Sequence, residues 1–281
     1  MSKIRLMSHN QWKCDDNLAE WENRGMDCSA ETRMRGFVKA YSEIQPDIVG
    51  GQDISALMAD KLVRYLAQDG QRYALLWGKD TPIIYRQDKF ELLDSDFFLY
   101  PEAVPGLFGS FNNEETKSWC LAVFREKESG KVFIFMTTHL WWKSSNPERP
   151  NYQPGSAEAR VYQIGLAIDC LERYAKKYQC PQVLVGDLNG GYESAAVQTA
   201  LSRGFLHAHD VAVEYADETK GHHKCGPKGV GPYTDEPFVT GIDHILVKDA
   251  GTEFVRRFER YSPEYYLPLS DHSPVFVDVE L

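Results

Sequence analysis

The chain has 281 residues and a net charge of −10, with 43% hydrophobic, 12% aromatic and 26% charged residues. This composition excludes a disordered chain, and the excess of acidic groups disfavours a protein that binds long duplex nucleic acid by neutralising its phosphates. Apolar stretches stay short of the ~18 residues that cross a membrane, so neither a membrane span nor stable membrane association is expected.

Hydrophobic periodicity predicts strands and helices that interleave along the whole chain. Strands are expected at 3–9, 47–51, 73–77, 82–86, 90–99, 118–125, 131–138, 182–186, 244–248, 254–261 and 274–280. Helices are expected at 31–45, 54–68, 156–179 and 194–203, with Pro46 ending the first, Ser156 as N-cap of the third and Gly204 ending the last. The segments 101–117, 141–155 and 216–241 are expected to be loops, and loops of this length are commonly functional.

A Glu128-Ser129-Gly130 turn between two apolar runs predicts a β-hairpin and therefore some antiparallel pairing. Strands mixed with helices in this way favour an α/β fold in which two packed sheets are covered by helices. With no repeat and no linker, a single domain over 1–281 is expected.

The six cysteines, at positions 14, 28, 120, 170, 180 and 225, include no C-x-x-C pair. We interpret them as reduced thiols. The first residues run directly into a strand pattern without a signal-peptide core, and a cytoplasmic protein is therefore predicted.

Six short polar clusters lie far apart in the chain, and each one adjoins an apolar run. They are Ser8-His9-Asn10, Gln52-Asp53, Thr138-His139, Gly186-Asp187-Leu188-Asn189, Ile242-Asp243 and Ser270-Asp271-His272. The first four end a predicted strand and the last two begin one. If the last two strands run antiparallel to the others, all six clusters meet at one rim of a sheet. Carboxylate and amide oxygens gathered there are ligands for a hard divalent cation.

Asp187 and Asn189 are two residues apart at the end of a buried strand, so both would lie on one face. The pair could hold water and a phosphoryl oxygen, although a simple Asp/Asn turn gives the same pattern. His272 could serve as acid or base near neutral pH, and Asp243 is predicted to orient its ring.

The other candidate residues each have a structural alternative. His139 could be a satisfied buried histidine, and Asn10 could cap a turn. Asp53 could be the N-cap of the following helix. Arg160 and Gln163 share one helix face and could reach the rim or face solvent.

The order and spacing of these polar clusters resemble those of the endonuclease/exonuclease/phosphatase (deoxyribonuclease I-like) superfamily over nearly the whole chain. The matching strings are Asn10, PDIVGGQD, IIYRQDKFELL, TTHL, the helix residues 159–163, GDLN, IDHILV and SDHSPV. The resemblance implies a four-layer α/β sandwich, with two mixed sheets packed face to face, and a metal-dependent hydrolase of phosphoester bonds. It further implies Mg²⁺, or alternatively Mn²⁺, bound by Asn10, Asp53 and Asp271.

By the same resemblance, Asp187 and Asn189 orient the attacking water and a phosphoryl oxygen. His139, Asn189 and Arg160 contact the phosphate, and His272, held by Asp243, acts at the scissile bond. The general base, His272 or Asp187, stays open. No obligate protein partner is inferred.

One position departs from the family pattern, because Asp53 stands where relatives usually carry Glu. The carboxylate is shorter by roughly 1.3–1.5 Å, about one carbon–carbon bond. The alternatives are a metal that is shifted or bound through water, and a catalytically weakened binding module. The change from Glu to Asp could be natural or deliberate.

His139 stands where exonuclease III-like enzymes have tyrosine, and Gly190-Gly191-Tyr192 differs from the string that follows their GDLN. The sequence therefore favours a phosphodiesterase or nuclease-like enzyme acting on short or single-stranded nucleic acid. A small-molecule or lipid phosphoesterase, of the inositol-phosphatase or sphingomyelinase kind, is the alternative. Trp141-Trp142 could stack on a base, insert into lipid or pack under a loop, and His222-His223 could hold a second metal.

Overall fold

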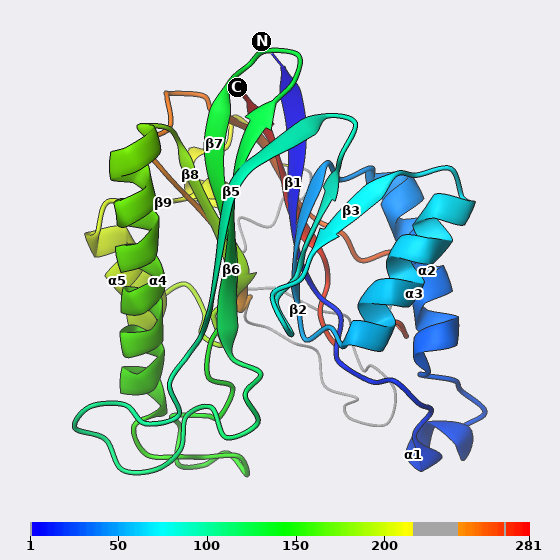
Figure 1. Ribbon diagram of the computed structural model, residues 1–281. Helices are drawn as coiled ribbons and strands as arrows, with labels where there is room; N and C mark the ends of the chain where they lie inside the picture. Colours follow the sequence, from blue (N-terminus) through cyan, green and yellow to red (C-terminus); the bar gives the residue numbers. More distant parts are fainter. Residues whose placement is uncertain (1, 216–240, 267) are drawn as a thin grey trace.

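Two β-sheets lie face to face and helices cover the outer face of each, which gives four layers (Figure 1). The computed structural model describes residues 2–215, 241–266 and 268–281. The seven-stranded sheet has the order β10 (Glu214–Tyr215), β12 (Val255–Arg260), β13 (Val275–Glu280), β1 (Lys3–Asn10), β2 (Ile48–Gln52), β4 (Ile83–Arg86) and β3 (Tyr73–Leu76). The six-stranded sheet has the order β5 (Phe90–Leu99), β6 (Ser118–Glu126), β7 (Val132–His139), β8 (Gln182–Asp187), β11 (Asp243–Lys248) and β9 (Leu206–His207). The predicted sandwich of two mixed sheets is confirmed.

Two pairs of helices flank the sheets (Figure 1). The helices α2 (Ala30–Ile44) and α3 (Ala56–Gln68) lie on the seven-stranded sheet, and α4 (Ser156–Tyr178) and α5 (Ala195–Ser202) lie on the six-stranded sheet. The sequence pattern missed the shortest elements, because two to four residues carry no periodicity. These are α1 (Ala19–Glu22), α6 (Ala208–Val211), the 3₁₀ helix η1 (Glu264–Tyr266), β9 and β10.

The N-cap predicted for α4 was wrong. Gly155 occupies that position with a left-handed φ of 82°, and Ser156 is the first helical residue. The Ser156 hydroxyl donates back to the carbonyl of Gln153 at 2.8 Å, so its side chain closes the preceding turn instead of capping the helix. Gly204 does follow α5 with a positive φ of 87°, as the pattern predicted.

Alternation along the strands separates three apolar layers. In β6, Cys120, Ala122 and Phe124 point into the core between the sheets. Leu121 and Val123, on the opposite face of the strand, pack beneath α4 and α5. A third cluster lies between the seven-stranded sheet and α2 and α3. Every β6 residue from Trp119 to Phe124 is therefore buried, as expected for a central strand covered on both faces.

Strand directions bring the polar clusters to one rim. The strand β2 runs parallel to β1, and β8 runs parallel to β7. The strand β13 is antiparallel to β1, and β11 is antiparallel to β8. The register places both His139 and Asp243 opposite Asp187. Four strands thus end, and two begin, at the same edge. None of the helices within the described residues is long and apolar enough to cross a bilayer.

Candidate active site

A cleft of about 600 Å³ opens at this rim. Its lining residues come from both sheets and from the loops beside them: Asn10, Lys13, Asp53, Glu114, Thr116, Lys117, His139, Trp142, Asn151, Asp187, Asn189, Asp271 and His272. Seven of the predicted site residues therefore line this one cleft, although they come from both ends of the chain.

The carboxylate of Asp187 contacts several of the other cleft residues. Its Oδ1 accepts the backbone N–H of Asn189 at 2.8 Å, and its Oδ2 accepts the side-chain amide of Asn10 at 3.0 Å. The same Oδ2 lies 3.4 Å from Nε2 of His139 and 3.8 Å from Nε2 of His272. One buried carboxylate thus connects β1, β7, β8 and the segment before β13.

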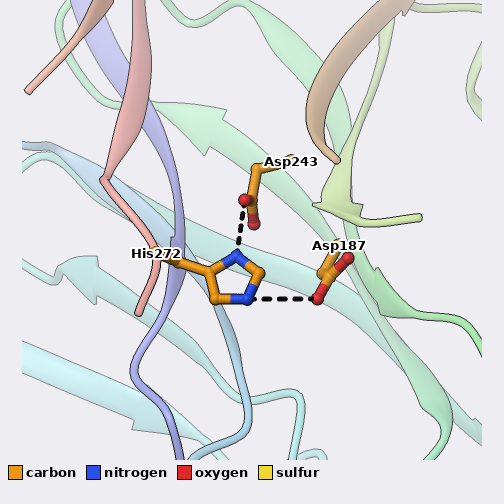
Figure 2. A group of neighbouring side chains, drawn as sticks. All are labelled: Asp187, Asp243 and His272. Carbon is orange, nitrogen blue, oxygen red and sulfur yellow. Dashed lines mark hydrogen bonds and ion pairs between the residues drawn. The ribbon is translucent and has the colours of Figure 1, made fainter. Parts of the chain in front are cut away.

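Asp243 orients His272 as the sequence predicted (Figure 2). Its Oδ2 lies 2.7 Å from Nδ1 of the ring, which leaves Nε2 directed toward Asp187. Burial lowers the pKa of His272, but the carboxylates of Asp243 and Asp271 outweigh it and hold that pKa well above its usual value of 6.5. The raised pKa favours the protonated ring, in which Nε2 is a hydrogen-bond donor toward Asp187.

The residue directly before Asp187 is Gly186, at a position that has no room for a side chain. Gly186 has a φ of 151°, and a Cβ built on it would lie 2.0 Å from the carbonyl oxygen of Thr138 on β7. Asn189 is itself left-handed, with a φ of 49°, and its amide donates to the carbonyl of Leu140 at 3.0 Å. The close contact between β7 and β8 sets the position of the Asp187 and Asn189 side chains.

Lys117 is a cleft residue that the sequence analysis missed. It is 4% exposed, and its Nζ lies 2.9 Å from Nε2 of His139. Burial lowers the pKa of Lys117 against the pull of Asp53 and Asp187. Burial and the Lys117 charge together lower the pKa of His139 to about 4, so this imidazole is neutral. The signal was available, because Lys117 directly precedes β6 at the same rim, and Ser118 pairs with His139.

The three residues predicted to hold the metal are Asn10, Asp53 and Asp271. All three line the cleft, and Oδ1 of Asp271 is buried without a hydrogen-bond partner among the described residues. Burial raises the pKa of Asp271. A buried carboxylate oxygen with no donor is what a cation would satisfy. Burial opposes ionisation of Asp53, but the positive charge around it, chiefly that of Lys117, outweighs burial and holds the pKa of the carboxyl below its usual value, so it is available as a charged ligand.

A second group of acidic and histidine side chains lies beside this one. Ligand atoms of Asp187, Asp243 and His272 all fall within 4.8 Å of one another (Figure 2). Two of the three are already joined, because Nδ1 of His272 lies 2.7 Å from Oδ2 of Asp243, while Oδ2 of Asp187 lies 3.8 Å from Nε2 of the same ring. This pairing favours a proton-handling group over a metal site.

Arg160 does not line the cleft. Its guanidinium donates to the carbonyls of Trp141 and Lys143, at 3.1 and 2.8 Å. Gln163 holds the same segment, because its Oε1 accepts the backbone N–H of Trp141 at 2.8 Å. Both side chains are buried and fix the loop after β7, and the phosphate contact predicted for Arg160 stays a prediction.

Trp141 and Trp142 have different environments. Trp141 is 1% exposed and packs under the loop, whereas Trp142 is 42% exposed and lines the cleft. Asp53 is not the N-cap of α3, because Ser55 occupies that position. The predicted pair His222-His223 and the loop around it lie outside the described residues.

Comparison with solved structures places this fold. An endonuclease/exonuclease/phosphatase from Bacteroides vulgatus is 22% identical, with 100% of each chain covered and a TM-score of 0.74. The chain has the endonuclease/exonuclease/phosphatase fold. A mannosyl-6-phosphatase from Bacteroides thetaiotaomicron is 18% identical over 99% of this chain and 100% of that one, with a TM-score of 0.72. TDP2 from D. rerio, solved with a single strand DNA product, is 16% identical over 100% of both chains, with a TM-score of 0.63. No protein-family model matches the chain, and no curated protein matches it.

Proposed function

We propose that the protein is a divalent-metal-dependent hydrolase of phosphoester bonds, and that it acts as a phosphodiesterase. The observation that carries this proposal is the meeting of Asn10, Asp187 and His272 in one cleft, joined by contacts of 3.0 and 3.8 Å through Asp187. The fold is that of proteins named as a phosphatase and as TDP2 bound to a single strand DNA product, which supports the same class of reaction.

Asn10, Asp53 and Asp271 would hold the cation, Mg²⁺ or Mn²⁺. When bound there, the cation would supply positive charge for a phosphoryl oxygen. The protein side chains account for the other requirements of an in-line attack. In Asp187, Oδ1 accepts the Asn189 N–H, and Oδ2 accepts the Asn10 amide at 3.0 Å. Because the carboxylate lines the cleft, it can orient a water molecule and accept its proton.

Two cationic groups would stabilise charge on the phosphoryl oxygens. Lys117 and the protonated form of His272 both line the cleft, Lys117 beside His139 at 2.9 Å and His272 beside Asp187 at 3.8 Å. Both are buried, so their charges act with little screening by water. Asp243 keeps Nε2 of His272 directed toward the cleft and stabilises its protonated state.

The decisive assay is turnover of bis-p-nitrophenyl phosphate with Mg²⁺, with Mn²⁺ and with EDTA, in the native chain and in Asp187→Asn. We expect turnover that needs the metal and falls by about 10³-fold or more in the variant. Asp169→Asn is the matched control, because Asp169 is a 65% exposed acid on α4. Turnover that is indifferent to EDTA and to Asp187→Asn would overturn the proposal.

A small phosphomonoester is the second candidate substrate, favoured by the outer wall of the cleft. Glu114 lines it, and its negative charge repels a long polyanion. Trp142 and Asn151 offer an aromatic face and an amide for a compact polar ligand. A panel of single-stranded DNA, A-tailed RNA, hexose 6-phosphates, inositol phosphates and sphingomyelin discriminates these classes. Preference for a hexose or inositol phosphate by tenfold or more in kcat/KM, an order of magnitude, would select the second candidate.

A further inference from the structure

Two cysteines lie against each other at the two ends of the segment 14–28, which we call the excursion. Cys14 follows β1 and Cys28 precedes α2, and the segment between them contains α1. Their Sγ atoms are 3.5 Å apart, and the side chains are 8% and 0% exposed. Both are free thiols in the structure. The sulfur atoms are therefore in van der Waals contact and shielded from solvent.

Hydrogen bonds hold the two backbones in this arrangement. The guanidinium of Arg33, buried at the start of α2, lies 3.5 Å from the carbonyl oxygen of Cys14 and 3.4 Å from that of Cys28. The Cys14 thiol donates to the carbonyl of Asp16 at 3.0 Å, and Sγ of Cys28 accepts the backbone N–H of Leu18 at 3.3 Å. One buried side chain thus contacts the backbone of both cysteines, and it holds their sulfur atoms 3.5 Å apart.

The excursion packs on a small apolar cluster of its own. Cys14, Trp21 and Cys28 are buried in it, with Trp12, Leu18 and Met26 packed around them. Trp12 stacks on Trp21 with ring centroids 5.2 Å apart. A cluster this small contributes little hydrophobic stabilisation, so a covalent cross-link would add to the stability of the segment.

We propose that Cys14 and Cys28 form an intramolecular disulfide when a low-molecular-weight disulfide, such as glutathione disulfide, is present as the oxidant. The thiolate of one cysteine attacks the oxidant and releases one glutathione thiol. The second cysteine then attacks the protein sulfur of the mixed disulfide and releases the other. The two protein thiols lose two protons and two electrons, and the oxidant becomes two thiols.

Burial affects when the bond can form. It raises the pKa of the Cys14 thiol to about 12, so the thiolate is scarce in the folded chain. Oxidation is therefore faster during folding than afterwards. The bond also affects the cleft, because Lys13 adjoins Cys14, lines the cleft and pairs with Asp80 at 3.1 Å. The cross-link would limit the motion of the segment that carries Lys13. This inference does not rest on the proposed function.

The full chain should be refolded in glutathione buffers that range from reducing to oxidising, alkylated and digested with trypsin without reduction. Trypsin cleaves after Lys13, Arg24 and Arg33, so each cysteine falls in its own peptide, 14–24 and 25–33. We expect the two peptides to appear as one linked species, lighter by two hydrogens, in the oxidising buffers. Cys180→Ser, at a buried position just after α4, is the matched control and should leave the link intact.

Limited proteolysis of the native chain gives a second measurement. Arg24 is exposed between the two cysteines, and cleavage there requires local opening of the excursion. We expect cleavage at Arg24 to be at least about tenfold slower in the oxidised chain than in the reduced chain. The Cys28→Ser variant should be cut equally fast in oxidising and reducing buffers. Separately alkylated 14–24 and 25–33 peptides in every buffer, or a link from Cys14 to any other cysteine, would overturn the proposal.

Discussion

Lys117 shows why a single buried charge matters at this site. Its ammonium lies among Asp53, Asp187 and His139, with little access to water. We expect Lys117→Met to lower kcat/KM for bis-p-nitrophenyl phosphate by about 10²–10³-fold, because one fixed cation near the phosphoryl oxygens is lost. Lys131→Met, at an exposed position directly before β7 and away from the cleft, should have no effect. Equal activity of the two variants would remove Lys117 from the site.

Asp53 gives a second prediction, about metal affinity. The residue has a left-handed φ of 53°, which aspartate adopts more readily than glutamate. Asp53→Glu should extend the carboxylate toward the cation and lower the Mg²⁺ concentration for half-maximal activity, at a stability loss of about 1 kcal/mol. Asp53→Asn should raise that concentration at least about tenfold. If calorimetry finds unchanged metal affinity in both variants, Asp53 is not a ligand.

At the scale of elements, the contact between β7 and β8 depends on Gly186. A Cβ there would lie 2.0 Å from the Thr138 carbonyl oxygen, so the strands would have to separate. We expect Gly186→Ala to lower the free energy of unfolding by about 3 kcal/mol or more and to abolish activity. Gly165→Ala, in α4 with nothing within 4 Å, should stabilise the protein by about 0.5–1 kcal/mol. Urea unfolding of both variants checks this pair, and similar midpoints would contradict it.

An ion pair between β1 and β13 makes stability depend on pH. Burial raises the pKa of Asp278, but bonds of 2.7 and 3.0 Å from Arg5 outweigh it and lower that pKa below 3.8. Because the folded-state pKa is depressed, this stabilisation is complete above the unfolded value and is lost as pH falls through the folded one.

We therefore expect Asp278→Asn to cost about 1–3 kcal/mol of unfolding free energy at neutral pH. The difference from the native chain should shrink as pH falls below 3.8, the ordinary aspartate value. Asp60→Asn, at an exposed position on α3, is the control. A gap between native and Asp278→Asn chains that stays constant down to the acid transition would contradict the assignment.

The sequence predicted the long elements well and their ends less well. Periodicity located β5 and α2–α5, because strands and helices of that length present a full apolar face. It placed the N-cap of α4 wrongly, because a serine at the first helical position looks the same as a cap. It also missed Lys117, since a lysine beside a loop is usually solvated.

At the scale of the whole molecule, the convergence of the polar clusters was predictable once strand directions were assumed, as the meeting of Asn10, Asp187 and Asp243 shows. The contacts that each side chain makes inside the cleft could not be predicted from the sequence. Whether Arg160 faces a phosphate or the loop carbonyls depends on three-dimensional packing that no local pattern records. A single domain over 1–281 and a cytoplasmic location stay predictions.

Net charge gives the prediction about substrate size. With −10 overall and Glu114 on the cleft wall, the chain should gain little from the counterion release that drives duplex binding. We expect kcat/KM for long duplex DNA to be at least about tenfold below that for short single strands of equal nucleotide concentration. Steady-state assays at two salt concentrations measure this, and a preference for duplex at low salt would contradict it.

The most direct measurement of the central claim is an anomalous difference map from crystals of the protein grown with Mn²⁺. We predict a peak in the cleft within ligand distance of oxygen atoms of Asn10, Asp53 and Asp271, with Asp187 beside it and His272 still hydrogen-bonded to Asp243. A peak held instead by Asp187, Asp243 and His272, or no peak in the cleft at a saturating metal concentration, would contradict the assignment of the metal site and the phosphoester chemistry built on it.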